Sequence, residues 1–483
     1  TAPQRCAMAE EFELNALTPL DGRYASRVAP VRAYFSEAAL IKYRVRVEVE
    51  YLVALSGAVP ALADVFAGGN LAKWRGVAAQ FGSADAARCK AIERTTNHDV
   101  KAVEYYLKER WDALGLPAVG KEFIHFGLTS QDVNHTAQPL MLAECARDAL
   151  VPRFEELVAA LKARAWEWRD LSMLARTHGQ SASPTRLGKE FAVFATRLEK
   201  CVAVLKACDH GAKFGGATGG FNAHCVAFPG RDWPAFGDAF VNDVSGGLLR
   251  RQKHTTQIEH YDDLAAFCAF SRRPLFYAWH TLAYRIVLGH ALCRCNTVVL
   301  DLCRDCWQYV SLAYFTQQLK AGEVGSSAMP HKVNPIDFEN AEGNLGIASA
   351  NLVHLAAKLP VSRLQRDLSD STALRALGVP LGHAYLALGS CLKGLGKLRV
   401  AEANLSADLE ANWAVVAEGI QTVLRREAYP NPYEALKALT RTGKPASKDD
   451  IRAFVDALDV PDAVKAELRA ITPHSYVGAF DAS

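Results

Sequence analysis

The stretch with the densest chemistry in this 483-residue sequence is Gly-Ser-Ser-Ala-Met-Pro-His-Lys-Val-Asn-Pro, residues 325–335. Ser326 and Ser327 could accept or donate a proton, and Lys332 and Asn334 are spaced to hold a carboxylate. Its two prolines exclude a regular helix. We therefore expect an ordered loop between helices, which could act as a lid.

A second loop carries an isolated histidine. Thr177-His-Gly-Gln180 separates two helical patterns, and Pro184 follows closely, so His178 is expected at the surface of a cleft. An imidazole changes protonation near neutral pH, at a pKa of about 6.5, and suits proton transfer. A lone histidine is, however, more often structural.

Polar groups precede two further helical patterns. Within Thr95–Asp99, Asp99 could accept an N–H from His98 and hold one tautomer, whereas Thr or Asn could simply cap the helix. Thr129 and Ser130 could present hydroxyls and N–H groups to an anion.

Two arginines flank a serine near the end of the long helical region. Arg366, Ser371 and Arg375 are spaced by five and four residues. Since Asp367 follows Arg366 directly and Asp370 directly precedes Ser371, the residues alone favour a solvated helix face.

The 325–335 stretch resembles the signature of the fumarase/aspartase superfamily, Gly-Ser-Ser-x-Met-Pro-x-Lys-x-Asn-Pro. With His331 and the Thr177–Gln180 loop, the sequence is most similar to the bacterial-type adenylosuccinate lyase family. The resemblance runs from Asp21-Gly-Arg-Tyr24 to the C-terminal helices.

This resemblance implies a β-elimination in purine biosynthesis that needs no metal or organic cofactor. Fumarate would leave adenylosuccinate, giving AMP, and the succinylated aminoimidazole carboxamide ribotide (SAICAR), giving AICAR. It implies Ser326 as base, His178 as acid, Lys332 with Asn334 as the electrostatic partner of a carboxylate, and Glu339 as orienting a histidine.

The resemblance also implies a set of substrate contacts. Arginine forks match phosphate oxygens, so Arg366 and Arg375 with Ser371 would clamp the 5′-phosphate. The full set is Arg23, Tyr24, Asn97, His98, Asp99, His125, Thr129, Ser130, Gln131, Gln257, Ser327, Met329, Asn334, Asn340, Arg366, Ser371 and Arg375.

The glycine-rich segment 211–220 could be taken for a phosphate cradle. It lacks Gly-Lys-Ser/Thr and follows no predicted strand, so this interpretation is weak. The segment also departs from the family pattern Gly-Ala-Val-Gly-Asn-Tyr-Asn-Ala-His, although Asn222-Ala-His224 remains.

Composition narrows the class of protein. The length predicts two or three domains, and 50% of the residues are apolar. A net charge of +3 without long runs of one sign indicates neither nucleic acid nor membrane as a partner. Scattered cysteines suggest reduced thiols and a cytoplasmic enzyme. Cys293, Cys295, Cys303 and Cys306 could ligate a metal, but their helical context favours packing.

Periodicity predicts an all-α protein. Helical spacing covers 36–55, 86–110 and a helix from about 134, and a 3.5-residue seam covers 281–320, a helix of some forty residues. We expect domains at 1–120, 121–395 and 396–483. The resemblance adds a homotetramer with a twenty-helix core and active sites shared between subunits.

Two alternatives stay open at this point. Another lyase of the superfamily could act on argininosuccinate or aspartate, although His331 and the Arg366, Ser371 and Arg375 set argue against it. The scaffold could also serve as a binding protein without chemistry, against which intact His178, Ser326 and Lys332 speak.

Overall fold

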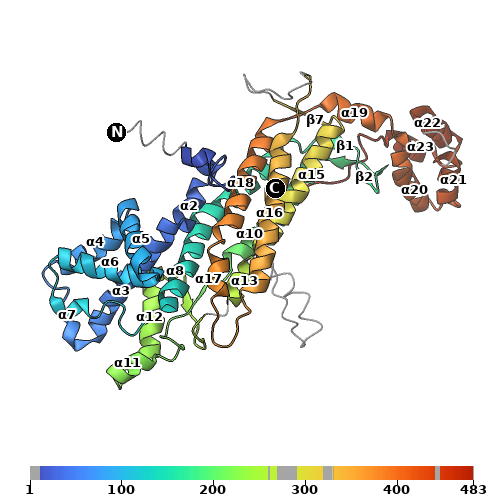
Figure 1. Cartoon of the computed structure of the whole chain (residues 1–483). Helices are drawn as coiled ribbons and strands as arrows, with labels where there is room; N and C mark the ends of the chain where they lie inside the picture. The colour runs from blue at the N-terminus through green and yellow to red at the C-terminus, as the bar shows by residue number, and fades with distance from the viewer. Residues whose placement is uncertain are drawn as a thin grey trace. The chain divides into compact units, whose positions relative to one another are not determined.

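The described part of the chain is mainly α-helical, as predicted (Figure 1). The computed structural model describes residues 11–258, 261–268, 291–318, 329, 331–440 and 446–481. Its α-helices are α2 (Ala29–Phe35), α3 (Glu37–Ala58), α4 (Asn70–Ala79), α5 (Ser83–Thr96), α6 (Asp99–Ala113), α7 (Ala118–Lys121), α8 (Ser130–Cys145), α9 (Val151–Glu167), α10 (Leu187–Lys206), α11 (Asn222–Ala227), α12 (Trp233–Ser245), α13 (Asp262–Cys268), α15 (Ala291–Ser311), α16 (Ile336–Lys358), α17 (Ser369–Leu374), α18 (Gly378–Lys397), α19 (Glu402–Glu410), α20 (Ala417–Arg426), α21 (Pro432–Thr440), α22 (Lys448–Ala457) and α23 (Asp462–Ala470).

Short elements connect these helices. The 3-10 turns are η1 (Ala25–Val28), η2 (Pro60–Leu62) and η4 (Trp413–Val416), and η3 (Ala146–Leu150) is a π-helical turn between α8 and α9. The described strands form pairs: β1 (Ser172–Met173) with β4 (Thr185–Arg186), β2 (Arg176–Thr177) with β3 (Gln180–Ser181), β5 (Gly211–Ala212) with β6 (Arg250–Arg251), and β7 (Phe315–Gln317) with β8 (Leu398–Val400). All pairs are antiparallel except β5 and β6.

The chain divides into two compact units. Unit 1 comprises 1–154, 201–297 and 343–387, and unit 2 comprises 155–200, 298–342 and 388–483. Helices α9, α10, α15, α16 and α18 contribute residues to both. The three predicted domains with boundaries near 120 and 395 stay a prediction.

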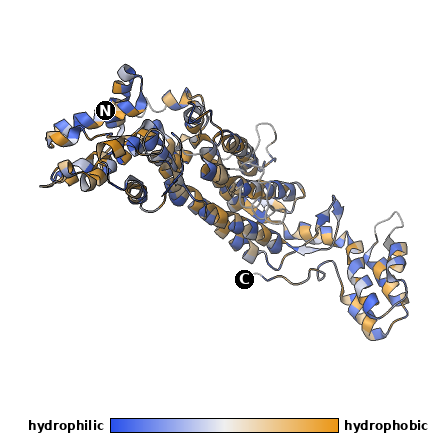
Figure 2. Ribbon diagram, turned by 90° about the horizontal axis from the view of Figure 1, so that it is seen from below, coloured by the Kyte–Doolittle hydropathy of each residue, from blue (hydrophilic) through white to orange (hydrophobic). Residues whose placement is uncertain are grey.

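The core of unit 1 is centred on α3, which packs against α4, α6, α8 and α12. The pattern predicted for 36–55 is confirmed, because Val45, Val49 and Leu52 on this helix are fully buried. Hydrophobic and hydrophilic residues alternate around the helices, as is expected for amphipathic helices that pack on a core (Figure 2).

Helix α8 begins at Ser130, four residues before the predicted start near Asn134. The Thr129 N–H donates to the Asp132 carboxylate at 2.8 Å, which caps the first turn. Pro139 lies inside the helix and has no N–H, so the carbonyl of His135 is left without its helical donor. The Lys213 N–H takes that place at 3.2 Å and ties the glycine-rich segment to α8.

Unit 2 contains a separate apolar cluster near the C-terminus. Residues of η4 and α20–α23 bury Trp413, Ile420, Leu424, Val455 and Leu468 against one another. Each helix is too short to be stable alone in water, so this shared core holds the group together.

The predicted helix over 281–320 is wrong at its C-terminal end. Within the described residues α15 ends at Ser311, and Ala313 has a left-handed φ of 55°. Phe315–Gln317 then pairs with β8 as a strand. The seam itself is confirmed from Leu292 to Cys306, because the side chains at its seam positions in this range are buried. Residues 281–290 and 319–320 lie outside the described part.

Candidate active site

Helix α6 begins at a histidine cap. His98 is the N-cap residue, and its Nδ1 accepts the Lys101 N–H at 3.1 Å. The predicted His98–Asp99 hydrogen bond is therefore wrong: Nδ1 lies 3.9 Å from Asp99 Oδ1 and is already used as an acceptor. In the neutral ring the proton must be on Nε2. That N–H points to Ser130 Oγ at 3.4 Å. Asn97, the residue before His98, is the C-cap of α5 and has a left-handed backbone conformation.

Asp99 instead joins two arginines. Its Oδ2 lies 2.8 Å from Arg44 Nη2 and 2.7 Å from Arg375 Nη2, and its Oδ1 accepts the Val100 N–H. Burial acts to raise the pKa of Asp99, but the two guanidinium groups and this N–H outweigh it and lower the pKa. Asp99 is therefore a stable anion between a buried and an exposed arginine.

A buried chain of polar side chains continues from Arg44. Arg44 Nε donates to Asn134 Oδ1 at 2.8 Å, and the Asn134 amide donates to Gln131 Oε1 at 2.6 Å. The Gln131 amide then reaches Asp370 Oδ2 at 3.3 Å. Gln131 is thus a buried link in this chain, whereas Ser130 beside it is half-exposed.

Asp370 is the second anion of this network. It is 2% exposed, so the solvated helix face expected from the residues alone is wrong at this position. The Tyr261 hydroxyl donates to Asp370 Oδ2 at 2.9 Å, and Arg366 Nε lies 3.6 Å from Oδ1. Burial acts to raise the pKa of Asp370, but its hydrogen bonds and Arg366 lower it.

The predicted phosphate clamp spans α17. Arg366 precedes the helix and is paired with Asp370, half-exposed Ser371 lies in its first turn, and Arg375 is its C-cap. The two arginines are thus held by different carboxylates of one polar network. The hydrogen bond to Asp99 orients the guanidinium of Arg375, whereas Arg366 makes an ion pair with Asp370 without a hydrogen bond at its Nε.

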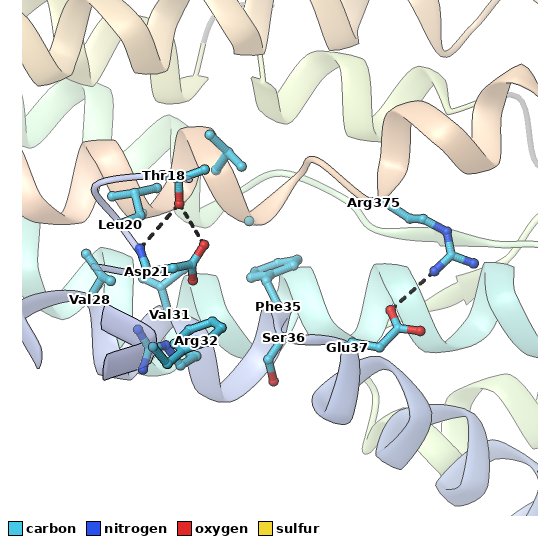
Figure 3. A pocket seen from close by; sticks show the side chains of 14 residues that line it. Thr18, Leu20, Asp21, Val28, Val31, Arg32, Phe35, Ser36, Glu37 and Arg375 are labelled. Carbon is cyan, nitrogen blue, oxygen red and sulfur yellow. Dashed lines mark hydrogen bonds and ion pairs between the residues drawn. The ribbon is translucent and has the colours of Figure 1, made fainter. Parts of the chain in front are cut away.

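Arg375 also borders a pocket of about 500 Å³ in unit 1 (Figure 3). Leu20, Val31 and Phe35 supply apolar walls. Glu37 and Arg375 point toward each other at one end, 3.2 Å apart, and the Thr18 hydroxyl donates to Asp21 at the other. The pocket therefore combines apolar area with a cation, as a ligand site requires.

His125 is held by a buried carboxylate. Its Nδ1 is 2.5 Å from Glu48 Oε1, and Glu48 is fully buried on α3. Burial acts to lower the pKa of His125, but the Glu48 charge and hydrogen bond raise it above its usual value. His125 has a left-handed φ of 63°, which fixes the direction of its ring at the turn before α8.

The glycine-rich segment binds a carboxylate of the protein itself. The N–H groups of Gly215 and Gly216 donate to Asp132 Oδ1 at 2.9 and 3.1 Å, and Lys213 Nζ lies 2.6 Å from the same oxygen. Lys213 and Asp132 are both fully buried. Because Asp132 already occupies these donors, they are not free to bind a phosphate, which agrees with the weak sequence evidence for a phosphate cradle.

His178 lies at the tip of a two-residue hairpin turn in unit 2. His178 and Gly179 have φ of 54° and 75°, the type I′ geometry that joins β2 and β3. The base of the hairpin is fixed by Arg176, which pairs with Asp408 at 2.7 Å. The imidazole is exposed, and no hydrogen bond joins it to another residue of the described chain.

The signature loop is described only in part. Ser326 and Ser327 lie outside the described residues. Met329 is 51% exposed, Lys332 is exposed and Asn334 is half-exposed. Helix α16 begins directly after Pro335, as the loop prediction requires.

The two predicted site residues on α16 have partners of their own. Glu339 accepts the indole N–H of Trp307 at 3.0 Å, where a histidine partner was expected. Asn340 accepts the Ser390 hydroxyl at 2.7 Å.

The remaining predicted contacts are near the surface of unit 1. Arg23 is exposed and lies 5.8 Å from the ring centre of half-buried Tyr24, and Gln257 is also half-buried. Thr129 is half-exposed at the start of α8. Unit 1 thus carries the predicted nucleotide contacts, and unit 2 carries His178 and the signature loop.

Sequence reasoning missed the residues that hold the site. Arg44 and Glu48 lie four apart on the buried face of α3 and contact Asp99 and His125. A charged pair inside an apolar stripe was the available signal, because charges are rarely buried without a partner.

Metal binding has no support in the described residues, where no group of three or more His, Cys, Asp or Glu side chains could hold an ion. The four cysteines of α15 are buried on one continuous helix. A hydrogen bond to Cys201 and burial raise the pKa of Cys295, and Cys391 acts likewise on Cys303. The part of the chain described also has no helix that could cross a bilayer.

Comparison with known proteins identifies the class. The family profile described as "Lyase" matches residues 22–275 and 253–348. A fumarate lyase from Mesorhizobium sp. BNC1 superposes with a TM-score of 0.65 at 18% identity, over 93% of this chain and 94% of that chain. A 3-carboxy-cis,cis-muconate lactonizing enzyme from Pseudomonas putida gives 0.66 at 20% identity, over 97% and 95%. The fold and the profile define a lyase of the fumarase/aspartase superfamily.

More similar relatives narrow this to one family. The profile "Adenylosuccinate lyase C-terminal" matches residues 362–477. The adenylosuccinate lyase of Dictyostelium discoideum is 50% identical to this chain, over 96% of this chain and 97% of that protein. The adenylosuccinate lyase of Vibrio cholerae is 46% identical, over 97% of this chain and 98% of that protein. The Escherichia coli K12 protein is 44% identical over 97% and 98%. The chain belongs to the adenylosuccinate lyase family.

Proposed function

We propose that this chain eliminates fumarate from adenylosuccinate, leaving AMP, and from SAICAR, leaving AICAR. The observation that carries this proposal is 50% identity to an adenylosuccinate lyase over 472 residues, nearly the full length of both chains. The chain keeps Ser326 and Lys332 at the positions where the superfamily pattern places them, and His178 in the loop that resembles the adenylosuccinate lyase family.

The proposed reaction needs three tasks from the protein. Ser326 takes the proton from Cβ of the succinyl group, and the electron pair is delocalised into the adjacent carboxylate, which Lys332 and Asn334 stabilise. The Cα–N bond then breaks to form the double bond of fumarate. His178 gives its proton to the departing nitrogen, so that charge and protons balance.

The groups of unit 1 would bind the nucleotide. Arg375 is a cation already oriented by Asp99, and Arg366 is a second cation paired with Asp370; both support a phosphate contact. The Nε2–H of His98 and the start of α8 provide further donors to an anion.

The location of His178 supports an oligomer with shared sites. Its ring is exposed on a hairpin tip, and no hydrogen bond to another described residue fixes its direction. A second subunit would supply the missing surroundings, in line with the expected homotetramer. We place this enzyme in the cytoplasm.

The test is turnover of adenylosuccinate by the purified protein. We expect fumarate and AMP in equal amounts, followed by absorbance and chromatography, and none from argininosuccinate or aspartate. Binding of adenylosuccinate without release of fumarate would instead indicate a scaffold without chemistry. Turnover of argininosuccinate or aspartate would indicate another lyase of the superfamily.

A further inference from the structure

We propose that Glu37 competes with the substrate's phosphate for Arg375 and thereby sets the affinity of the phosphate subsite. The inference rests on the proposed function, in which Arg375 binds the 5′-phosphate. The structure shows the guanidinium of Arg375 between two carboxylates, Asp99 at 2.7 Å and Glu37 at 3.2 Å.

The contact with Asp99 is the permanent one. Asp99 Oδ2 also binds Arg44, which is 2% exposed, at 2.8 Å. Moving Asp99 away would leave the buried guanidinium of Arg44 without its anion, which is costly. Arg375 is therefore anchored through Nη2.

The contact with Glu37 is the exchangeable one. Both side chains are 42% exposed, and only Arg375 Nη1 and Glu37 Oε2 meet. Exposed pairs of this kind are weak, whereas a phosphate offers an arginine several oxygens of higher charge. Both residues line the pocket of Figure 3, so an anion has space beside them.

Lys90 can retain Glu37 when Arg375 is taken over by phosphate. Its Nζ lies 3.2 Å from Glu37 Oε1, the oxygen that does not face Arg375, and 2.6 Å from Glu93. Lys90 thus lowers the cost of releasing Glu37 from Arg375. Removing Lys90 should act in the opposite direction to removing the charge of Glu37.

The experiment measures dissociation constants of inorganic phosphate and AMP by calorimetry. Glu37→Gln should tighten both by about two- to fivefold, the range an exposed ion pair covers, and Lys90→Met should weaken both. In the double variant the Lys90 effect should vanish, because Lys90 acts through Glu37. Glu109→Gln is the matched control, which removes an exposed charge of unit 1 that is paired with Arg88.

Three results overturn the inference: unchanged constants in Glu37→Gln, an equal shift in Glu109→Gln, or no phosphate binding in any protein. The turnover assay separates this failure from that of the proposed function. Normal fumarate release with unchanged constants rejects the role of Glu37 alone. Absent fumarate release with the constants ordered as expected rejects the reaction alone.

Discussion

The two units hold their predicted site residues in opposite ways. In unit 1, buried charges support the arginines, since Arg44 and Asp370 are each only 2% exposed. In unit 2, His178 lies on an exposed hairpin tip and Lys332 on an exposed loop. The predicted binding groups of unit 1 are therefore supported by contacts within the fold itself.

Because of this difference, substitutions in unit 1 should change folding stability, whereas substitutions of the exposed groups in unit 2 should change activity alone. A group inside a buried network cannot be removed without leaving its partner unpaired, which costs folding free energy. An exposed group on a turn can be removed with little effect on folding. Substitutions in the two units should therefore have different signatures.

The largest effect is expected from His178→Ala. Loss of a positioned acid should lower kcat about 10²–10⁴-fold. The free energy of unfolding should change by less than about 0.5 kcal/mol, because the side chain is exposed. Steady-state kinetics and urea unfolding measure the two quantities. A near-normal kcat would show that another group protonates the leaving nitrogen.

Next in size is Asp99→Asn, which leaves Arg44 without its anion. Breaking a buried pair costs about 3–5 kcal/mol, and since Asp99 keeps 23% of its side chain exposed, we expect about 2–3 kcal/mol. Glu50→Gln breaks the exposed pair with Arg75 and should cost less than about 1 kcal/mol. Equal costs in urea unfolding would contradict the supporting role of the buried network.

The smallest effect is expected in the pH dependence of the unfolding free energy, to which His125 contributes. Because Glu48 raises the folded pKa of His125, the charged pair stabilises the fold fully below the unfolded pKa of about 6.5. This stability is lost as the pH rises through the folded pKa. His125→Asn tolerates the left-handed backbone and should flatten that part of the profile of unfolding free energy against pH.

The control for this profile is an exposed histidine of unit 2. His474→Asn removes a pair with Glu410 at 3.0 Å, both side chains being more than a third exposed. Its profile should follow that of the wild type. If His125→Asn leaves the wild-type profile unchanged, the Glu48 contact does not carry a charge.

Local patterns in the sequence were enough to predict the helices but not all of their ends. The helix over 36–55 and the start of α16 after Pro335 follow from spacing and proline alone. No glycine or proline marks the end of α15 at Ser311. That end depends on pairing of β7 with residues 398–400, far along the chain, which overrides local helix preference.

The same limit applies to the site. Its motifs could be identified from the family resemblance, because the residue types around Arg366 and Arg375 alone favoured a solvated helix face. Their partners could not, since Arg44 reaches Asp99 only when α3 packs beside the start of α6. The cap formed by His98 was likewise hidden, because histidine is not a usual capping residue.

The most direct test of the divided site mixes two inactive proteins, His178→Ala and Ser326→Ala, under conditions of subunit exchange. If the two residues of one site come from different subunits, random mixing leaves about one quarter of the sites intact. We therefore expect about a quarter of wild-type fumarate release. Mixed oligomers that form but stay inactive would contradict the account.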